Sequence, residues 1–176
     1  MALLTTAALL LCGCRAGAAR AASPEQIAGR LSQPFETHIA ARAENLELEG
    51  DLTRRGPGSF TFCITAPQTL AGLTVQAQDG GCSLSYGGMG TALEQGSLLR
   101  GSPPWLLCSA LDALTRREQL TARAVKDTVL VEGRAAGQAF SLSLDRQGVP
   151  LRFKVPACGL ELTFSEFRYT GQTTES

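Results

Sequence analysis

The 176-residue sequence predicts a mainly β (α+β) domain, in which two or three short helices accompany one antiparallel sheet, open or curled toward a barrel. Three observations predict this class. Short segments alternate apolar and polar residues in steps of two, turn residues separate these segments at short intervals, and only two segments have clear helical spacing. The length and the 44% hydrophobic content are ordinary for one globular domain.

The first segment, residues 1–13, is apolar and ends in small residues, which is typical of an export signal. It is too short for a membrane span, which needs about 20 apolar residues. The run Leu11-Cys12-Gly13-Cys14 resembles the lipobox of bacterial lipoproteins, although the usual basic residue before the apolar stretch is missing. That resemblance implies a signal peptide over 1–13 and lipid attachment at Cys14. The alternative is an apolar N-terminal helix with two incidental cysteines.

Residues 14–23 are rich in Ala, Gly and Arg without an apolar period, so they are expected to form a flexible tether. The folded domain is expected to span 24–176. A lipidated Cys14 would place that domain at the cell membrane, anchored on the extracytoplasmic side.

Two helices are expected. The first begins at Pro24, with Ser23 as its cap, carries Ile27 and Leu31 on one face, and ends before Pro34. The second begins at Ser102-Pro103-Pro104 and has apolar residues at helical spacing, namely Leu107, Leu111 and Leu114.

The strands are expected to form hairpins, because turn residues such as Arg54-Arg55-Gly56-Pro57-Gly58 and Asp79-Gly80-Gly81 separate them. Residues 87–101 are expected to be a loop with a short helical turn around Ala92 to Gln95. The predicted strands are 46–52, 59–65, 73–77, 82–86, 120–125, 128–134, 138–145, 151–156 and 160–169, with an earlier strand around His38.

The alternation assigns more apolar side chains to one face of this sheet than two short helices can cover. Because exposed apolar area costs about 25 cal/mol per Å², the sheet is expected to curl over the helices, bind something apolar, or both. The residues expected on this inner face are Leu46, Leu48, Phe60, Phe62, Ile64, Leu73, Val75, Leu84, Phe140, Leu142, Leu144, Leu151, Phe153, Val155, Leu160, Leu162 and Phe164.

Two segments carry a resemblance to the LolA, LolB and LppX group of lipoprotein carriers. The first runs from Gly58 to Pro67 and continues through Leu70, Leu73, Val75, Asp79-Gly80, Leu84 and Tyr86, and the second runs from Leu144 to Phe153. The resemblance covers 35–169 and implies a strongly curved antiparallel half-barrel, whose concave apolar face is covered by helices and accepts acyl chains. The implied cavity residues are Phe60, Phe62, Ile64, Leu73, Val75, Leu84, Phe140, Leu142, Leu151 and Phe153, with Trp105, Leu107 and Leu111 as its plug or lid. The group also resembles a clostridial germination lipoprotein that binds a cell-wall amidase.

The sequence gives little support for a catalytic site or a metal site. His38 is the only histidine, no G-x-S-x-G occurs, and no phosphate-binding glycine motif is present. Glu47, Glu49 and Asp51 alternate on an outer face and are expected to be solvated. The 16 basic and 16 acidic residues balance, which argues against nucleic acid as a partner. No catalytic residue, metal or cofactor is therefore assigned.

Four cysteines remain beyond the signal region, namely Cys63, Cys82, Cys108 and Cys158. Three disulfide connectivities are open in an exported domain. The alternation places Cys63 and Cys82 on opposite faces, so these two are not expected to pair, and Cys82 and Cys108 are expected to be buried thiols.

The leading functional hypothesis is a non-enzymatic lipoprotein that binds an acyl chain, a lipid or a lipoprotein anchor in a half-barrel cavity. The alternative is an envelope or spore adaptor that binds a protein partner, with outer or edge positions such as Glu132 and Arg152 at the contact. A hydrolase that uses His38 comes third.

Overall fold

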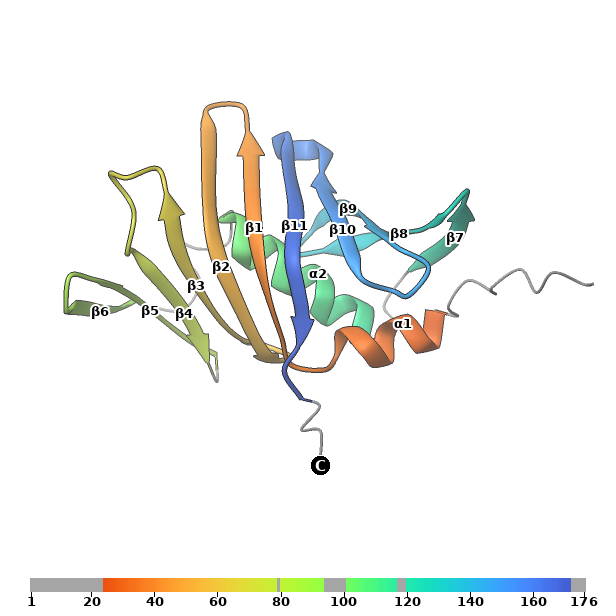
Figure 1. The fold of residues 1–176 in the computed structure, drawn as a ribbon, viewed down its shortest axis with the longest axis horizontal. Coiled ribbons are helices and arrows are strands. Elements are labelled where there is room, and N and C mark those ends of the chain that lie inside the picture. Colours follow the sequence, from red (N-terminus) through yellow and green to blue (C-terminus); the bar gives the residue numbers. More distant parts are fainter. Residues whose placement is uncertain (1–23, 79, 94–100, 117–119, 172–176) are drawn as a thin grey trace, which may run out of the picture.

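The computed structural model describes residues 24–78, 80–93, 101–116 and 120–171. They form one curved sheet with two α-helices (Figure 1). The elements in chain order are α1 Pro24–Leu31, β1 Phe35–Ala43, β2 Leu46–Gly56, β3 Ser59–Ala66, β4 Thr74–Gln78, β5 Gly81–Tyr86, β6 Met89–Leu93, α2 Pro103–Arg116, β7 Thr121–Val125, β8 Thr128–Ala135, β9 Gln138–Leu144, β10 Pro150–Val155, the 3₁₀ turn η1 Pro156–Cys158, and β11 Leu160–Tyr169.

The sheet consists of two antiparallel meanders joined at its centre. The strand order is β6-β5-β4-β3-β2-β1-β11-β10-β9-β8-β7, so the first and last strands of the chain are neighbours. Their register pairs Ile39 with Phe164 and Ala41 with Leu162, all four buried. We call β1 to β6 the N-terminal wing and β7 to β11 the C-terminal wing.

Helix α2 covers the concave face. It crosses behind β2, β1 and β11 in Figure 1 and packs against β8 and against α1. The side chains of Leu107 and Leu111 are completely buried, as are Leu52, Leu142 and Leu162 on the sheet. The helix therefore occupies the concave face directly, and its apolar side is part of the core.

The predicted helices and hairpins are confirmed. The first helix ends at Leu31, the second runs through Leu107 and Leu114, and β3 ends at Ala66, immediately before Pro67. The mainly β class with a strongly curved, open antiparallel sheet is confirmed as well.

Three expectations are wrong in part. Met89–Leu93 is strand β6, paired with β5, where the sequence suggested a loop entering a helical turn; residues 94 and 95 of that turn lie outside the described part of the chain. Leu151 is 40% exposed and not on the inner face, because a register irregularity between Pro150 and Arg152 breaks the alternation that continues at Phe153. Arg54, expected in a turn, is a buried residue of β2.

Candidate ligand-binding site

A large hollow lies where α2 meets the hairpin turns of both wings. Its volume is about 710 Å³. The N-terminal wing contributes residues of the β2–β3 and β4–β5 hairpins, and the C-terminal wing contributes the β8–β9 turn. The lining residues are Gly58, Phe60, Ala77, Gly80, Gly81, Trp105, Cys108, Ser109, Asp112, Ala113, Arg116, Arg134, Ala135, Ala136 and Gly137. We call this hollow the α2 cleft.

One stripe of α2 forms the floor of the α2 cleft. Trp105, Ser109, Asp112 and Arg116 recur every three or four residues, so they share one side of the helix. None of the four is fully buried in the core, whereas Leu107 on the opposite side is. The helix therefore has a dry side on the sheet and a mixed apolar and polar side on the cleft.

An ion pair fixes this helix to the sheet. The side chain of Arg54 is fully buried and donates from Nη2 to Asp112 Oδ1 at 2.6 Å, and from Nη1 to the carbonyl of Leu31 at 2.8 Å. The second oxygen of Asp112 accepts the backbone N–H of Gly58 at 2.9 Å. One guanidinium thus connects β2, the end of α1 and the middle of α2, while Asp112 also holds the β2–β3 turn.

The sequence-predicted cavity residues divide into three groups. Phe60 and Trp105 line the α2 cleft. Leu73 and Leu84 are partly buried beside the core, and Leu151 is exposed. The others are buried together in the hydrophobic core: Phe62, Ile64, Val75, Leu107, Leu111, Phe140, Leu142 and Phe153. Cys14 lies outside the described residues.

Sequence reasoning missed the polar residues of the cleft, Asp112, Arg116 and Arg134. A signal was present for the first two, since the period that aligns Leu107 and Leu111 also aligns Trp105 with Asp112 on another side of the helix. Arg134 precedes the β8–β9 turn, and only the curvature of the sheet brings it to the helix. Its Nη2 donates to the carbonyl of Gly137 at 2.9 Å.

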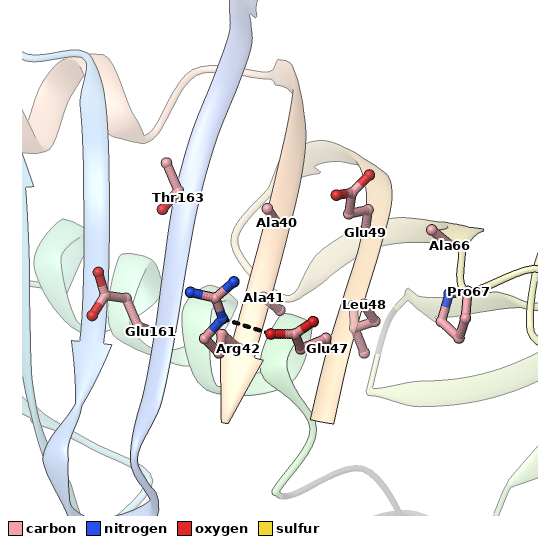
Figure 2. A pocket seen from close by; sticks show the side chains of 10 residues that line it. All are labelled: Ala40, Ala41, Arg42, Glu47, Leu48, Glu49, Ala66, Pro67, Glu161 and Thr163. Carbon is pink, nitrogen blue, oxygen red and sulfur yellow. Dashed lines mark hydrogen bonds and ion pairs between the residues drawn. The ribbon is translucent and has the colours of Figure 1, made fainter. Parts of the chain in front are cut away.

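A smaller hollow, of about 400 Å³, lies at the end of the sheet where β1, β2 and β11 meet (Figure 2). Three of its four charged residues are already paired: Arg42 Nε donates to Glu47 at 2.8 Å, and Glu161 binds Lys154 at 2.9 Å and Arg152 at 3.1 Å. The fourth, Glu49, has an oxygen 3.8 Å from His38 Nε2. The hydrogen bond from Lys154, helped by the nearby cations, lowers the pKa of Glu161. This hollow is a solvated, internally balanced surface.

His38 belongs to an exposed row on the outer face. Asp51 lies opposite it on β2 and Ser165 opposite it on β11, which is the composition of a hydrolytic triad. The ring, however, directs Nδ1 to Asp51 Oδ1 at 2.8 Å and has Nε2 3.8 Å from Glu49. Both nitrogens therefore face carboxylates of β2 and not the hydroxyl on β11. The expected strand around His38 is confirmed as β1, and the His38 side chain is 26% exposed.

The four described cysteines are free. Cys108 is buried, as expected, whereas Cys82, also expected to be buried, is only partly so. Cys63 is partly buried as well, and Cys158 is exposed. Within the described ranges, no three His, Cys, Asp or Glu side chains gather as a metal site would require.

Comparison with known proteins shows the fold alone. No protein-family model matches the sequence, and no curated protein is significantly similar to it. Among solved structures, an uncharacterized conserved protein from Thermus thermophilus has 18% identity and a TM-score of 0.52, over 84% of this chain and 85% of that one. MucB has 16% identity and a TM-score of 0.52, over 85% of this chain and 59% of MucB.

A LolA superfamily protein from Nitrosomonas europaea is also among the matches, with 9% identity and a TM-score of 0.47, over 85% of this chain and 93% of that one. No helix in the part of the chain that the structure describes is long and apolar enough to cross a bilayer.

Proposed function

We propose that this chain is a non-enzymatic lipoprotein, anchored through Cys14 on the extracytoplasmic side of a cell membrane, and that it binds the acyl chain of a lipid or of another lipoprotein in the α2 cleft. The observation that carries the proposal is the cleft itself, a hollow between α2 and both wings whose lining combines apolar with polar and charged side chains.

The dimensions and walls of the α2 cleft suit such a ligand. Its volume of about 710 Å³ falls in the range of about 300 to 1,000 Å³ that small-molecule sites have. Among its apolar lining residues, Trp105 and Ala135 are partly exposed, whereas Phe60, Ala77 and Ala113 are almost fully buried. Burial of an acyl chain against them yields about 0.8 kcal/mol per methylene.

Charged groups stand beside these walls and suit the polar end of an amphiphile. Asp112 is already matched by Arg54, so its charge is neutralised within the protein. Arg134 donates to the carbonyl of Gly137, a neutral acceptor, so its positive charge remains at the cleft. An acyl chain that ends in a carboxylate or phosphate fits this distribution better than a neutral hydrocarbon.

The ligand in this proposal lies along α2 and not beneath it. Leu107 and Leu111 are completely buried in the same core cluster as the predicted cavity residues Phe62 and Leu142, which are therefore closed off from solvent. These residues would contact a ligand only after α2 had moved, which would first require the Arg54 and Asp112 pair to separate.

Trp105 allows a direct test, because it is the only tryptophan of the chain and it lines the α2 cleft. A fatty acid brominated along its chain should quench the emission of Trp105 in the purified protein, and an unlabelled fatty acid should reverse the quenching. Saturable quenching at micromolar concentrations supports the proposal. No quenching, together with no binding of a fluorescent fatty acid, contradicts it.

A matched pair of variants tests where the ligand binds. Ser109→Phe adds a ring to the floor of the cleft and should weaken binding by about tenfold, since it removes much of the space beside Trp105. Ser143→Phe puts the same ring on the outer face of β9, away from the cleft, and should leave binding unchanged. Equal affinity of both variants would show that the ligand binds elsewhere.

An adaptor that binds an envelope protein is a second candidate, favoured by strand β7. This strand forms one edge of the sheet, and all five of its residues are exposed. Such an edge can accept a strand from a partner through backbone hydrogen bonds. Capture of one specific partner by the full chain, and its loss when Ala122→Pro removes a backbone donor from β7, would support this role over lipid binding.

A further inference from the structure

The N-terminal wing has an unusual charge distribution. From Phe60 to Leu93, the stretch that forms β3, β4, β5 and β6, the sequence contains one charged residue, Asp79. The polar side chains of this stretch are instead Ser, Thr and Gln, for example Gln76 and Gln78 on β4. A soluble surface of this length ordinarily carries several charges, at about one residue in four.

The rest of the outer face is very different. Across β2, β1, β11 and β10, cross-strand ion pairs join Arg42 to Glu47, Arg168 to Glu36, and Arg152 and Lys154 to Glu161. The change from charged to uncharged surface coincides with the boundary between β2 and β3. The lack of charge is therefore local to one end of the molecule.

The end of this uncharged region exposes large apolar side chains. Met89 is 75% exposed and Tyr86 is 50% exposed, and the two are direct cross-strand partners at the β5–β6 turn. Gly87 and Gly88 form that turn with positive φ angles of 56° and 83°. The hairpin therefore ends in an aromatic ring, a thioether and two residues without side chains.

The neighbouring loop between β3 and β4 extends this surface. The ring of Tyr86 lies 3.9 Å from the position that a Cβ atom at Gly72 would occupy, so the hairpin and this loop lie side by side. The same loop exposes Leu70 by 37%. Three of the five large apolar residues that are exposed in the described structure thus lie in the β5–β6 hairpin and the adjoining β3–β4 loop. Strands β5 and β6 are at the left of Figure 1.

We propose that this end of the N-terminal wing, formed by Leu70, Tyr86 and Met89 with Gly87 and Gly88, is a docking surface for the interface of a lipid bilayer. Tyr favours the headgroup region, where its ring is half-buried and its hydroxyl stays hydrated, and Met89 can enter the acyl boundary. Insertion of a charged surface would cost desolvation energy, and this surface has no charged side chain to desolvate.

This contact differs from the lipid anchor and from the α2 cleft. It uses residues that line neither the cleft nor the smaller hollow. It also lies at the opposite end of the long axis from α1, which follows the tether (Figure 1). A bilayer contact here would give the anchored domain a second point of attachment and hence a fixed orientation.

Vesicle flotation of residues 14–176 with Cys14→Ser, a protein that lacks the apolar segment 1–13 and cannot be lipidated, tests the proposal. We expect this protein to float with phosphatidylcholine vesicles, and to float equally with vesicles that also contain phosphatidylglycerol, at low and at high salt. Flotation that requires the anionic lipid and disappears in salt would overturn the proposal, because it would identify an electrostatic contact.

Two further variants locate the contact. Met89→Glu should reduce the bound fraction by about tenfold, whereas Leu151→Glu, at an exposed Leu of the C-terminal wing, should not change it. Tyr86→Trp should keep binding, and its emission should shift to the blue with vesicles in a Trp105→Phe background. The proposal would be refuted if Met89→Glu floated as well as the parent protein. It would also be refuted if the emission wavelength of the tryptophan at position 86 were the same with and without vesicles. Neither result depends on whether the α2 cleft binds fatty acids.

Discussion

Arg54 Nη2 lies 2.6 Å from Asp112 Oδ1, and this contact joins a strand near the centre of the sheet to the helix that covers its concave face. The Arg54 side chain has no exposed surface, and that of Asp112 has 14%. Two charges in such surroundings are tolerated because each neutralises the other and because Leu31 and Gly58 supply further hydrogen bonds. The pair therefore connects α2 to β2 through charges that must be removed together if they are removed at all.

Loss of Arg54 alone should be severe. Arg54→Met leaves the carboxylate of Asp112 with only the N–H of Gly58, and we expect the free energy of unfolding to fall by about 3 to 5 kcal/mol in urea titrations. The double variant Arg54→Met, Asp112→Leu removes both charges and should recover most of that loss. A single variant as stable as the parent protein would contradict this account of the pair.

Gly50 should not tolerate a side chain. It lies in β2 where a Cβ would come within 2.5 Å of the carbonyl oxygen of Cys63 and 2.6 Å of the ring of Phe62. Gly50→Ala should therefore destabilise the protein by about 1 to 3 kcal/mol, measured by thermal or urea unfolding. The control is Gly29→Ala in α1, where no atom lies within 4 Å, and it should stabilise by about 0.5 to 1 kcal/mol. The same sign for both variants would show that the close approach at Gly50 relaxes freely.

Cys108 should be inert in the native protein. Burial raises the pKa of its thiol well above the ordinary range, so the thiol stays protonated. A labelling reagent therefore cannot reach the sulfur and finds no reactive thiolate there. Peptide mass spectrometry after iodoacetamide treatment should find Cys158, which is exposed, labelled first, and Cys108 labelled only after urea is added. Equal labelling rates at both positions would refute the burial of Cys108.

The buried thiol of Cys108 should also lower the free energy of unfolding at alkaline pH. Because the pKa of Cys108 is raised on folding, the folded state binds its proton more tightly than the unfolded state does. Its contribution is fully present below the unfolded pKa of about 8.5 and declines as the pH rises above that value. The free energy of unfolding should therefore fall between about pH 8.5 and pH 10.5, and Cys108→Ala should make this decline shallower. A decline just as steep in Cys108→Ala would assign it to other groups.

The anchor proposed at Cys14 has its own test. Growth of an expressing bacterium with radioactive palmitate should label the protein, and Cys14→Ser should abolish the label. Cys12→Ser is the control, because it changes the neighbouring cysteine of the proposed signal, and it should leave the label in place. Label that persists in Cys14→Ser would place the acylation elsewhere.

Most of the fold could be predicted because its strands follow simple rules. Phe60, Phe62 and Ile64 alternate with polar residues, and all three are buried, as an even pleat requires. Prediction failed where the pleat is interrupted. The irregularity beside Pro150 turns Leu151 outward, and β6 contains too few apolar residues to show an alternation at all.

The candidate site was less accessible to sequence reasoning. Trp105 could be placed at the covering helix, but the α2 cleft also needs Phe60, Ala77 and Ala135, which come together only when both wings curve around α2. Arg54 shows the same limit. Its neighbours Arg55 and Gly56 suggested a turn, and only the partner on α2, distant in sequence, explains why an arginine is buried there.

The pairing of β1 with β11 has a consequence for the order of folding. Thr37 Oγ1 donates to the carbonyl of Ser165, a partner 128 residues further along the chain. Each wing consists of hairpins between sequence neighbours and can begin to form locally, but the seam between the wings must wait for the last strand to be synthesised. The domain is therefore expected to reach its final form slowly and only after synthesis is complete, which fits the proposed export of a chain that crosses a membrane unfolded before it assembles.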